Sequence, residues 1–262
     1  MLRNTQEFID LMDTPQNILN DTEGSVYKHT YLATQYMIDY INRVKDPKYK
    51  DTDYRDILVY SVLLHDIGKP KATKVGDDGL YHCMYHATIG EDIASIFLKR
   101  YASEIIGYKK KVILQLVRYH MHPSYIFKRQ NPSKLLLSLV NNLEIDFEAL
   151  LLLKKCDWKG TMVKNPRNYK KILKKAQELY YSVCSYPSGT NVILKKIKDI
   201  TGNIYPKNIN IGDTFKGILT HPITKGMRTS LGFRFSTSPV DKIIDKTHFQ
   251  TQNSIYEIIK IK

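Results

Sequence analysis

The spacing of apolar residues predicts helices through most of the first 200 positions. Stretches with a period near 3.6 residues cover 26–44, 54–66, 86–102 and 107–121, and Asn4 with Glu7 indicates an earlier short helix. Further helices are expected over 133–160, with a break near Asn141 and Asn142, and over 166–184. No segment before residue 200 alternates as a strand would, so this part is predicted to be all-helical.

The helix expected over 54–66 differs from its neighbours because it is apolar on nearly every side. Such a helix is buried in the core of a domain. It ends in the sequence LLHDIGKP, where His65 and Asp66 stand side by side. Gly68 is expected to stop it in a left-handed conformation, and Pro70 prevents its continuation.

The last 60 residues have a different pattern. GDTFKGILTHPI, GFRFSTSPVDKII and SIYEIIKIK are rich in β-branched and aromatic residues and are separated by Gly, Asn and Pro. We therefore expect a mainly α protein, with a helical domain at 1–190 followed by a small β-rich domain at 200–262. A small barrel is one fold that this β-rich domain could have.

Composition narrows the class of protein. The apolar fraction of 42% in 262 residues is enough for a sizeable core, and the three cysteines are too few and too scattered for a disulfide framework or a thiolate zinc site. The N-terminus resembles no signal or transit peptide, and no apolar run is long enough to span a bilayer. These features predict a cytoplasmic protein without membrane contact.

The net charge of +14 is concentrated in one region. Residues 154–199 contain twelve Lys or Arg against three acids. An excess of this size attracts polyanions, so this span is a candidate for nucleic-acid contact, although a solvated helix face has the same composition.

The pair His65 and Asp66 points to a metal ion. Successive side chains leave a helix about 100° apart, so both reach one ligand only if it lies close to the helix end. A buried carboxylate in an apolar helix also requires a cation. Imidazole and carboxylate donors without thiolates favour Mn, Ni, Co, Fe or Zn, with Mg possible, over Ca.

Several sequence words occur in an order typical of one superfamily. His29 in VYKHTYL, His65 and Asp66 in LLHDIGKP, and Asp157 in LLKKCDWKG resemble the ordered signature of the HD-domain metal-dependent phosphohydrolases. With YHATIGEDIA and LVRYHMHP, the likeness is greatest to the HD domain of bacterial CCA-adding tRNA nucleotidyltransferases. It covers roughly residues 22–165, and the chain has no room for their polymerising head.

The resemblance implies roles for individual residues. His29, His65, Asp66 and Asp157 would hold one metal, His86 and His120 would hold a second, and Asp66 would bridge the two. Lys69 would contact a substrate phosphate and act with His65 and Asp66 in catalysis. Arg118 and His122 are further candidates for substrate binding because they lie beside His120.

The expected reaction is metal-assisted hydrolysis of a phosphoester on a nucleotide or an RNA 3′ end. The likeness favours a 2′,3′-cyclic phosphate or a 2′-phosphate as substrate. Two alternatives remain open: an HD nucleotidase or hydrolase of deoxynucleoside triphosphates or cyclic dinucleotides, and a non-catalytic RNA- or DNA-binding module with a structural metal. No base-recognition motif distinguishes them, and the oligomeric state is not predicted.

Overall fold

The structure is a computed structural model of the whole chain. It describes residues 2–16, 24–145, 147–161, 167–183, 191–200, 211–219, 223, 228–231, 235–244 and 247–260. The chain divides into two compact units, one formed by Met1–Tyr125 and Ala149–Leu173 and the other by Ile126–Glu148 and Lys174–Lys262. Among the described helices, none is both long and apolar enough to cross a membrane.

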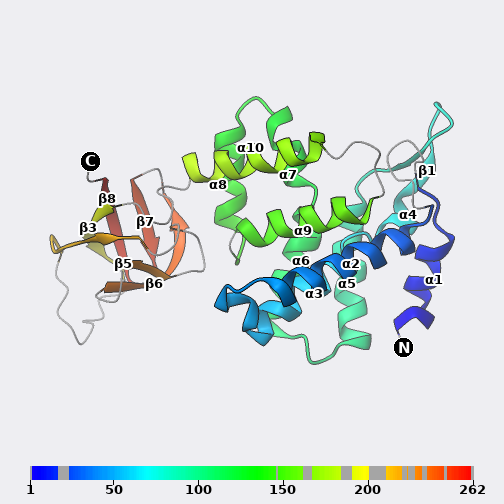
Figure 1. Cartoon of the computed structure of the whole chain (residues 1–262), viewed down its shortest axis with the longest axis horizontal. Coiled ribbons are helices and arrows are strands. Elements are labelled where there is room, and N and C mark those ends of the chain that lie inside the picture. The colour runs from blue at the N-terminus through cyan, green and yellow to red at the C-terminus, as the bar shows by residue number, and fades with distance from the viewer. Residues whose placement is uncertain are drawn as a thin grey trace. The chain divides into compact units, whose positions relative to one another are not determined.

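The first unit is built mainly from helices (Figure 1). Its long helices are α2 (Val26–Arg43), α3 (Thr52–Leu64), α5 (His86–Tyr101), α6 (Gly107–Tyr119) and α9 (Phe147–Gly160), which begins two residues before the unit's second segment. Shorter elements complete it, namely η1 (Leu2–Asn4), α1 (Gln6–Asp13), η2 (Pro47–Lys50), α4 (Lys69–Ala72), α7 (His122–Tyr125) and the start of α10 (Arg167–Val183). The helices predicted from apolar spacing are therefore present.

One part of this unit corrects the all-helical prediction. Residues between α4 and α5 form a hairpin of β1 (Thr73–Val75) and β2 (Tyr81–Cys83), paired antiparallel with Lys74 opposite His82. Each strand has three residues and little burial, so neither shows the alternation by which strands are found in sequence. The turn residues of GDDG connect them.

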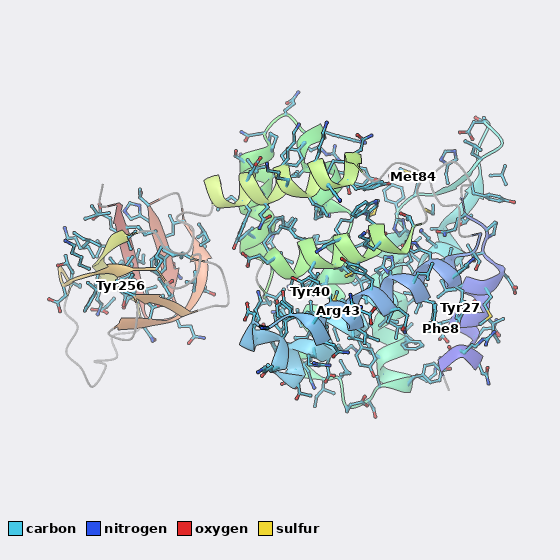
Figure 2. The ribbon with its side chains drawn as sticks, viewed as in Figure 1. Phe8, Tyr27, Tyr40, Arg43, Met84 and Tyr256 are labelled. Carbon is cyan, nitrogen blue, oxygen red and sulfur yellow. The ribbon has the colours of Figure 1, made fainter. Side chains whose placement is uncertain are left out.

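Helix α3 is the buried centre that its composition predicts. Ile57, Leu58, Val62 and Leu64 are all at most 2% exposed. Its N-cap is Asp51, whose side chain accepts a hydrogen bond from the backbone N–H of Tyr54. At the amino end of the unit, Phe8 packs edge-on against Tyr27. Figure 2 labels both residues.

Gly68 corrects a second expectation. It has φ −85° and ψ −11°, in the right-handed helical region, and it is the N-cap of α4, so it is not a left-handed stop. A Cβ atom at this position would lie 2.1 Å from the carbonyl oxygen of His86 and 2.5 Å from the backbone nitrogen of Gly90. The glycine is therefore required by the close approach of the α3–α4 turn to α5, and not by its own backbone angles.

Helices α2 and α9 run antiparallel and pack with their backbones unusually close together. The sulfur atoms of Cys156 and Met37 are 3.9 Å apart, and a Cβ on Gly160 would lie 2.8 Å from the carbonyl oxygen of His29 and 2.9 Å from the Cβ of Ala33. Only a glycine allows this separation. Because His29 and Asp157 lie on these two helices, the close packing also determines how near the two side chains approach.

The second unit contains a six-stranded antiparallel sheet in the order β4-β3-β8-β7-β6-β5. The strands are β3 (Asn191–Asp199), β4 (Thr214–Ile218), β5 (Arg228–Leu231), β6 (Phe235–Ile243), β7 (His248–Thr251) and β8 (Ser254–Lys260). The unit also holds η3 (Ile126–Lys128), α8 (Pro132–Asn142) and the rest of α10. The predicted β-rich C-terminal region is present, but its first strand begins at Asn191, before the expected position 200.

The sheet encloses a core of its own. Val192, Leu194, Val240 and Phe249 are at most 1% exposed, and Phe249 stacks on Tyr256, which Figure 2 labels. The two outer strands of the order, β4 and β5, approach each other at an isolated bridge between Leu219 and Leu231. The sheet therefore curls toward a small barrel.

Replacement of Gly160 tests the contact between α2 and α9. Gly160→Ala is expected to lower the free energy of unfolding by about 1–3 kcal/mol, despite a gain of about 1 kcal/mol in helix propensity, because the new methyl meets backbone atoms that cannot rotate away. Urea denaturation measures the change. Exposed Lys99 on α5 is the control, and Lys99→Ala is expected to stay within about 0.5 kcal/mol of the parent. An equally stable Gly160→Ala protein would contradict this account of the packing.

Candidate metal centre

Six polar side chains come together where five helices of the first unit begin or end. His29 is in the first turn of α2, His65 follows α3, His86 begins α5, His120 follows α6 and Asp157 is in the last turn of α9. Asp66 is next to His65 in the turn after α3. All six are buried, so the chain has removed six ligand-type groups from water within one small volume.

The histidines present the same nitrogen to this volume. Three of them donate the Nδ1 proton to the carbonyl oxygen three residues earlier: His65 to Val62 at 2.7 Å, His86 to Cys83 at 2.8 Å and His120 to Val117 at 2.7 Å. A carbonyl oxygen can only accept, so Nδ1 must carry the proton in each ring. In a neutral ring this tautomer leaves a lone pair on Nε2, directed at the cluster, as in metal-ligating histidines.

These lone pairs face one another. The Nε2 atoms of His86 and His120 are 3.2 Å apart, and those of His29 and His65 are also 3.2 Å apart. Neither Nε2 of the His86–His120 pair can donate to the other while both rings are neutral, so their contact is repulsive without a cation. Two nitrogens bound to one metal at 2.0–2.1 Å are roughly 3 Å apart, which fits the observed spacing.

Protonation of the histidines does not place a positive charge between these nitrogens. Burial lowers the pKa of His86 and lowers that of His120 well below its ordinary value, and the neighbouring histidines lower the second further. Both rings are therefore neutral at physiological pH. The donor set of neutral imidazoles and carboxylates fits a divalent metal.

Asp66 lies between the two histidine pairs and gives one oxygen to each. Its Oδ2 is 3.2 Å from Nε2 of His65 and 3.5 Å from Nε2 of His29, whereas its Oδ1 is 3.4 Å from Nε2 of His86 and 3.8 Å from Nε2 of His120. Two groups of possible ligands result, His29–His65–Asp66 and Asp66–His86–His120. Asp66 could therefore contribute one carboxylate oxygen to each group.

Asp157 adds a second carboxylate to the first group. Its Oδ1 is 3.3 Å from Nε2 of His29 and 3.9 Å from Nε2 of His65. The structure therefore brings together the four residues that the resemblance assigns to one metal, His29, His65, Asp66 and Asp157. His86 and His120 lie on the other side of Asp66, and the role of all six as metal ligands stays a prediction.

Two lysines compensate the buried carboxylates. Nζ of Lys69 lies 2.7 Å from Oδ2 of Asp66, and Nζ of Lys154 lies 2.5 Å from Oδ2 of Asp157. Burial alone would raise the pKa of both aspartates, but the ammonium of Lys69 beside Asp66 and that of Lys154 beside Asp157 help to hold both pKa values well below their usual value. Both carboxylates are therefore ionised and ready to bind a cation.

Lys154 was not singled out in the sequence. It is 7% exposed, and apart from Asp157 its ammonium also contacts the sulfur of Met121 at 3.4 Å. The sequence feature that could have indicated its role is its position three residues before Asp157, since Lys69 stands three residues after Asp66. It was overlooked because Lys154 is the first residue of a long basic span, in which lysines are expected to lie on the surface.

The remaining predicted residues have other neighbours. Lys69 belongs to the cluster, and Gln16 holds its ammonium at 2.8 Å. Arg118 forms an ion pair with Glu91, which raises its pKa. His122 packs edge-on against the ring of Tyr119. The substrate-binding roles of Arg118 and His122 therefore stay predictions.

The paired geometry predicts two bound divalent ions per chain. His86→Gln is expected to leave one, because the second group loses a ligand while the first keeps all of its own, and Asp66→Asn is expected to weaken both sites. Titration calorimetry with Mn²⁺ on chelator-treated protein, followed by metal analysis, measures the stoichiometry. His82→Gln is the control, because His82 is exposed in the hairpin and pairs with Asp78. Unchanged stoichiometry in His86→Gln would exclude the second position.

The comparisons with known proteins agree with the site. A search of curated proteins gave no match to this chain. A family model described as the HD domain matches residues 26–177, which is more than half of the chain and spans all six clustered groups. The family generally comprises metal-dependent phosphohydrolases, and its histidine and aspartate ligands bind divalent cations. On this match, the chain belongs to the HD domain family.

Proposed function

We propose that this protein is a dinuclear metal-dependent phosphohydrolase that acts on the phosphate of a nucleotide or an RNA 3′ end, with a 2′,3′-cyclic phosphate or a 2′-phosphate as favoured substrate. The observation that carries the proposal is the carboxylate of Asp66, whose two oxygens each face one pair of histidine nitrogens. A structural metal would need only one such group. Two adjacent cation positions are typical of enzymes that hydrolyse phosphoesters.

The ligand set would be divided between two ions. His29, His65, Asp66 and Asp157 would hold the first, and Asp66, His86 and His120 the second. When bound, divalent cations provide a reactive nucleophile from water near neutral pH and neutralise charge on a phosphoryl group. Mn, Ni, Co, Fe, Zn and Mg all remain compatible with these donors.

The protein's own groups prepare the site for this reaction. The hydrogen bonds from Nδ1 to backbone carbonyls orient each ring and keep its Nε2 basic. The burial of the cluster excludes most water, which strengthens every charge interaction within it. The rings and carboxylates therefore need little rearrangement when a substrate arrives.

Lys69 and Lys154 would bind the substrate phosphate. Each ammonium already contacts a carboxylate of the cluster, so both lie beside the groups that would hold the ions. Each lysine would then offer its protons to a phosphate oxygen beside the ions, with Gln16 holding Lys69 in place. We assign Lys154 this role together with Lys69.

Two observations support a substrate at the end of a nucleic acid. The sequence words around the ligands resemble those in the HD domain of CCA-adding tRNA nucleotidyltransferases, which handle RNA 3′ ends. The basic span 154–199 starts three residues before Asp157; residues 162–166 and 184–190 of it lie outside the described part of the chain. A nucleotide or cyclic-dinucleotide hydrolase is the second candidate, because the ligand set is the same for both.

A substrate panel tests the proposal. Chelator-treated protein would be supplied in turn with Mn, Ni, Co, Zn or Mg and with 2′,3′-cyclic AMP, 2′-AMP, 3′-AMP, 5′-dAMP, dGTP and cyclic dinucleotides. We expect metal-dependent release of phosphate or ring opening with the first two, and its loss to background in Asp66→Ala. Turnover only of 5′-dAMP, dGTP or cyclic dinucleotides would favour the second candidate. Stoichiometric metal binding without any turnover would contradict the enzyme.

Lys154→Met examines the phosphate contact within the same assay. Loss of one charge-assisted hydrogen bond is expected to lower kcat/KM by roughly 10- to 100-fold, with metal stoichiometry unchanged. Lys99→Met is the matched control, because Lys99 is an exposed lysine of α5. Equal activities of Lys154→Met and the parent would remove Lys154 from the site.

A further inference from the structure

Aromatic rings and ammonium groups alternate along the surface where α2 lies beside α9. The ammonium of Lys155 is 4.9 Å from the ring centroid of Tyr40 and 6.0 Å from that of Tyr36. The ammonium of Lys159 is 5.7 Å from the ring of Tyr36 and 5.1 Å from the ring of Trp158. The row continues with Tyr169, whose ring stacks on Trp158 at 5.5 Å with an interplanar angle of 25°.

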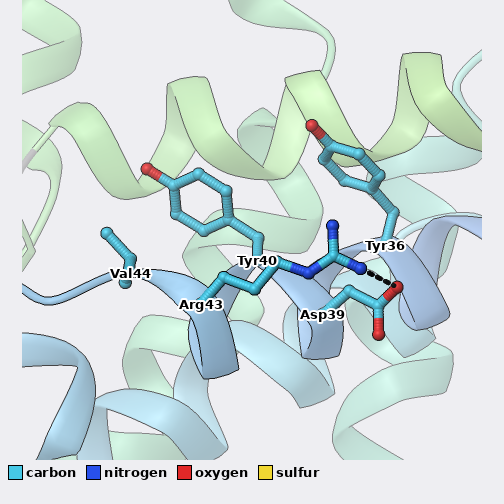
Figure 3. Close-up of a pocket in the computed structure, with 5 residues that line it drawn as sticks. All are labelled: Tyr36, Asp39, Tyr40, Arg43 and Val44. Atoms are coloured by element: carbon cyan, nitrogen blue, oxygen red, sulfur yellow. Dashed lines mark hydrogen bonds and ion pairs between the residues drawn. The ribbon is translucent and has the colours of Figure 1, made fainter.

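We name this row the aromatic–basic ladder, and it is made up of Tyr40, Lys155, Tyr36, Lys159, Trp158 and Tyr169. Trp158 is buried and supports the row from beneath, whereas Tyr36, Tyr40 and Tyr169 are half-buried. Beside it lies a pocket of about 240 Å³ lined by Tyr36, Asp39, Tyr40, Arg43 and Val44 (Figure 3). Figure 3 shows the two tyrosine rings on the same side of α2, with the guanidinium of Arg43 between them in the view. One nucleobase with part of its sugar would fill such a pocket.

The charges beside the pocket favour an anionic occupant. Arg43 is 81% exposed and meets Asp39 at 3.5 Å, one helical turn away, which is a weak surface pair. Lys159 is exposed and Lys155 half-buried, and Lys170 and Lys171 are exposed next to Tyr169. Asp39 is the acid among the pocket-lining residues, so cations predominate along this surface.

The spacing of the rings favours a single strand over a duplex. Tyr36 and Tyr40 are one turn apart, about 6 Å along the helix axis. Stacked bases follow one another at about 3.4 Å, so neighbouring bases can each meet one ring only in an extended, unstacked strand. Proteins that bind single strands combine aromatic faces for the bases with cations for the phosphates in this way.

We propose that the aromatic–basic ladder and its pocket form a binding site for single-stranded nucleic acid, in which bases stack on Tyr36 and Tyr40 and phosphates pair with Arg43, Lys155 and Lys159. Tyr36 is seven residues from His29, about 10 Å along α2. The site is therefore separate from the metal cluster, and binding there requires no metal. The inference goes beyond the proposed hydrolase activity and stands without it.

Fluorescence anisotropy with a labelled 12-nucleotide RNA of mixed sequence, in EDTA and at fixed moderate salt, tests the site. The chelator removes catalysis, so a failure of the proposed reaction leaves this measurement unchanged. We expect the single strand to bind more tightly than the same sequence as a duplex. Removal of both rings in Tyr36→Ala/Tyr40→Ala should weaken binding at least about tenfold, and Tyr36→Phe/Tyr40→Phe should retain it because phenylalanine keeps the stacking face.

The controls separate stacking from general charge attraction. Tyr31→Ala removes an exposed tyrosine from another face of α2, and it is expected to bind as the parent does. Lys159→Glu should weaken binding about as strongly as the double alanine variant, whereas Lys99→Glu on α5 should have a much smaller effect. Because Lys159 is exposed, its replacement leaves the fold intact even if the alanine variant unfolds.

Three results would overturn the proposal. These are the absence of RNA binding, equal affinity for the duplex and the single strand, and equal weakening by Lys159→Glu and Lys99→Glu. The first would mean that the aromatic–basic ladder does not bind nucleic acid, and the other two would mean that binding depends on the general positive charge of the chain and not on this site. Retained binding by a folded Tyr36→Ala/Tyr40→Ala protein would likewise exclude stacking on these rings.

Discussion

Much of the first unit depends on one constraint, the burial of an ionised carboxylate between two pairs of imidazoles. Asp66 is 2% exposed, and no single partner satisfies both of its oxygens. An ionised carboxylate in such surroundings is costly unless cations lie on both sides of it. Lys69 provides one positive charge, and the four histidine nitrogens provide lone pairs that themselves need a cation. Bound cations would therefore stabilise this arrangement of buried carboxylate and imidazole groups.

The fold brings these groups together through backbone contacts that larger residues would prevent. Gly68 lets the turn that carries His65 and Asp66 touch the start of α5, where His86 lies. Gly160 does the same for α9 and α2, which carry Asp157 and His29. Hydrogen bonds to backbone carbonyls then orient three of the rings. The close packing of the helices, the tautomer of the three histidines and the charges of the carboxylates therefore all contribute to the same site.

The sequence predicted those elements and residues whose local pattern is strong. The long helices follow from the spacing of apolar residues, and the clustered groups follow from the ordered sequence motifs around His29, His65, Asp66 and Asp157.

Other features have no such pattern. The hairpin of β1 and β2 was missed because each strand has only three residues, which are too few to show an alternation of apolar and polar positions. Strand β3 was missed because its lysines, among them Lys195 and Lys196, made it look like a continuation of the basic span. The role of Gly68 was assigned wrongly, because close approach to α5 is a tertiary property that no local pattern contains. The predicted boundary between the two domains stays a prediction.

Anomalous diffraction from crystals grown with Mn²⁺ would test the central claim most directly. The account predicts two anomalous peaks about 3.5–4 Å apart, one on each side of Asp66, the first among His29, His65 and Asp157 and the second between His86 and His120. A single peak that leaves His86 and His120 without a ligand, or two peaks that do not share Asp66, would contradict the bridging carboxylate on which the account depends.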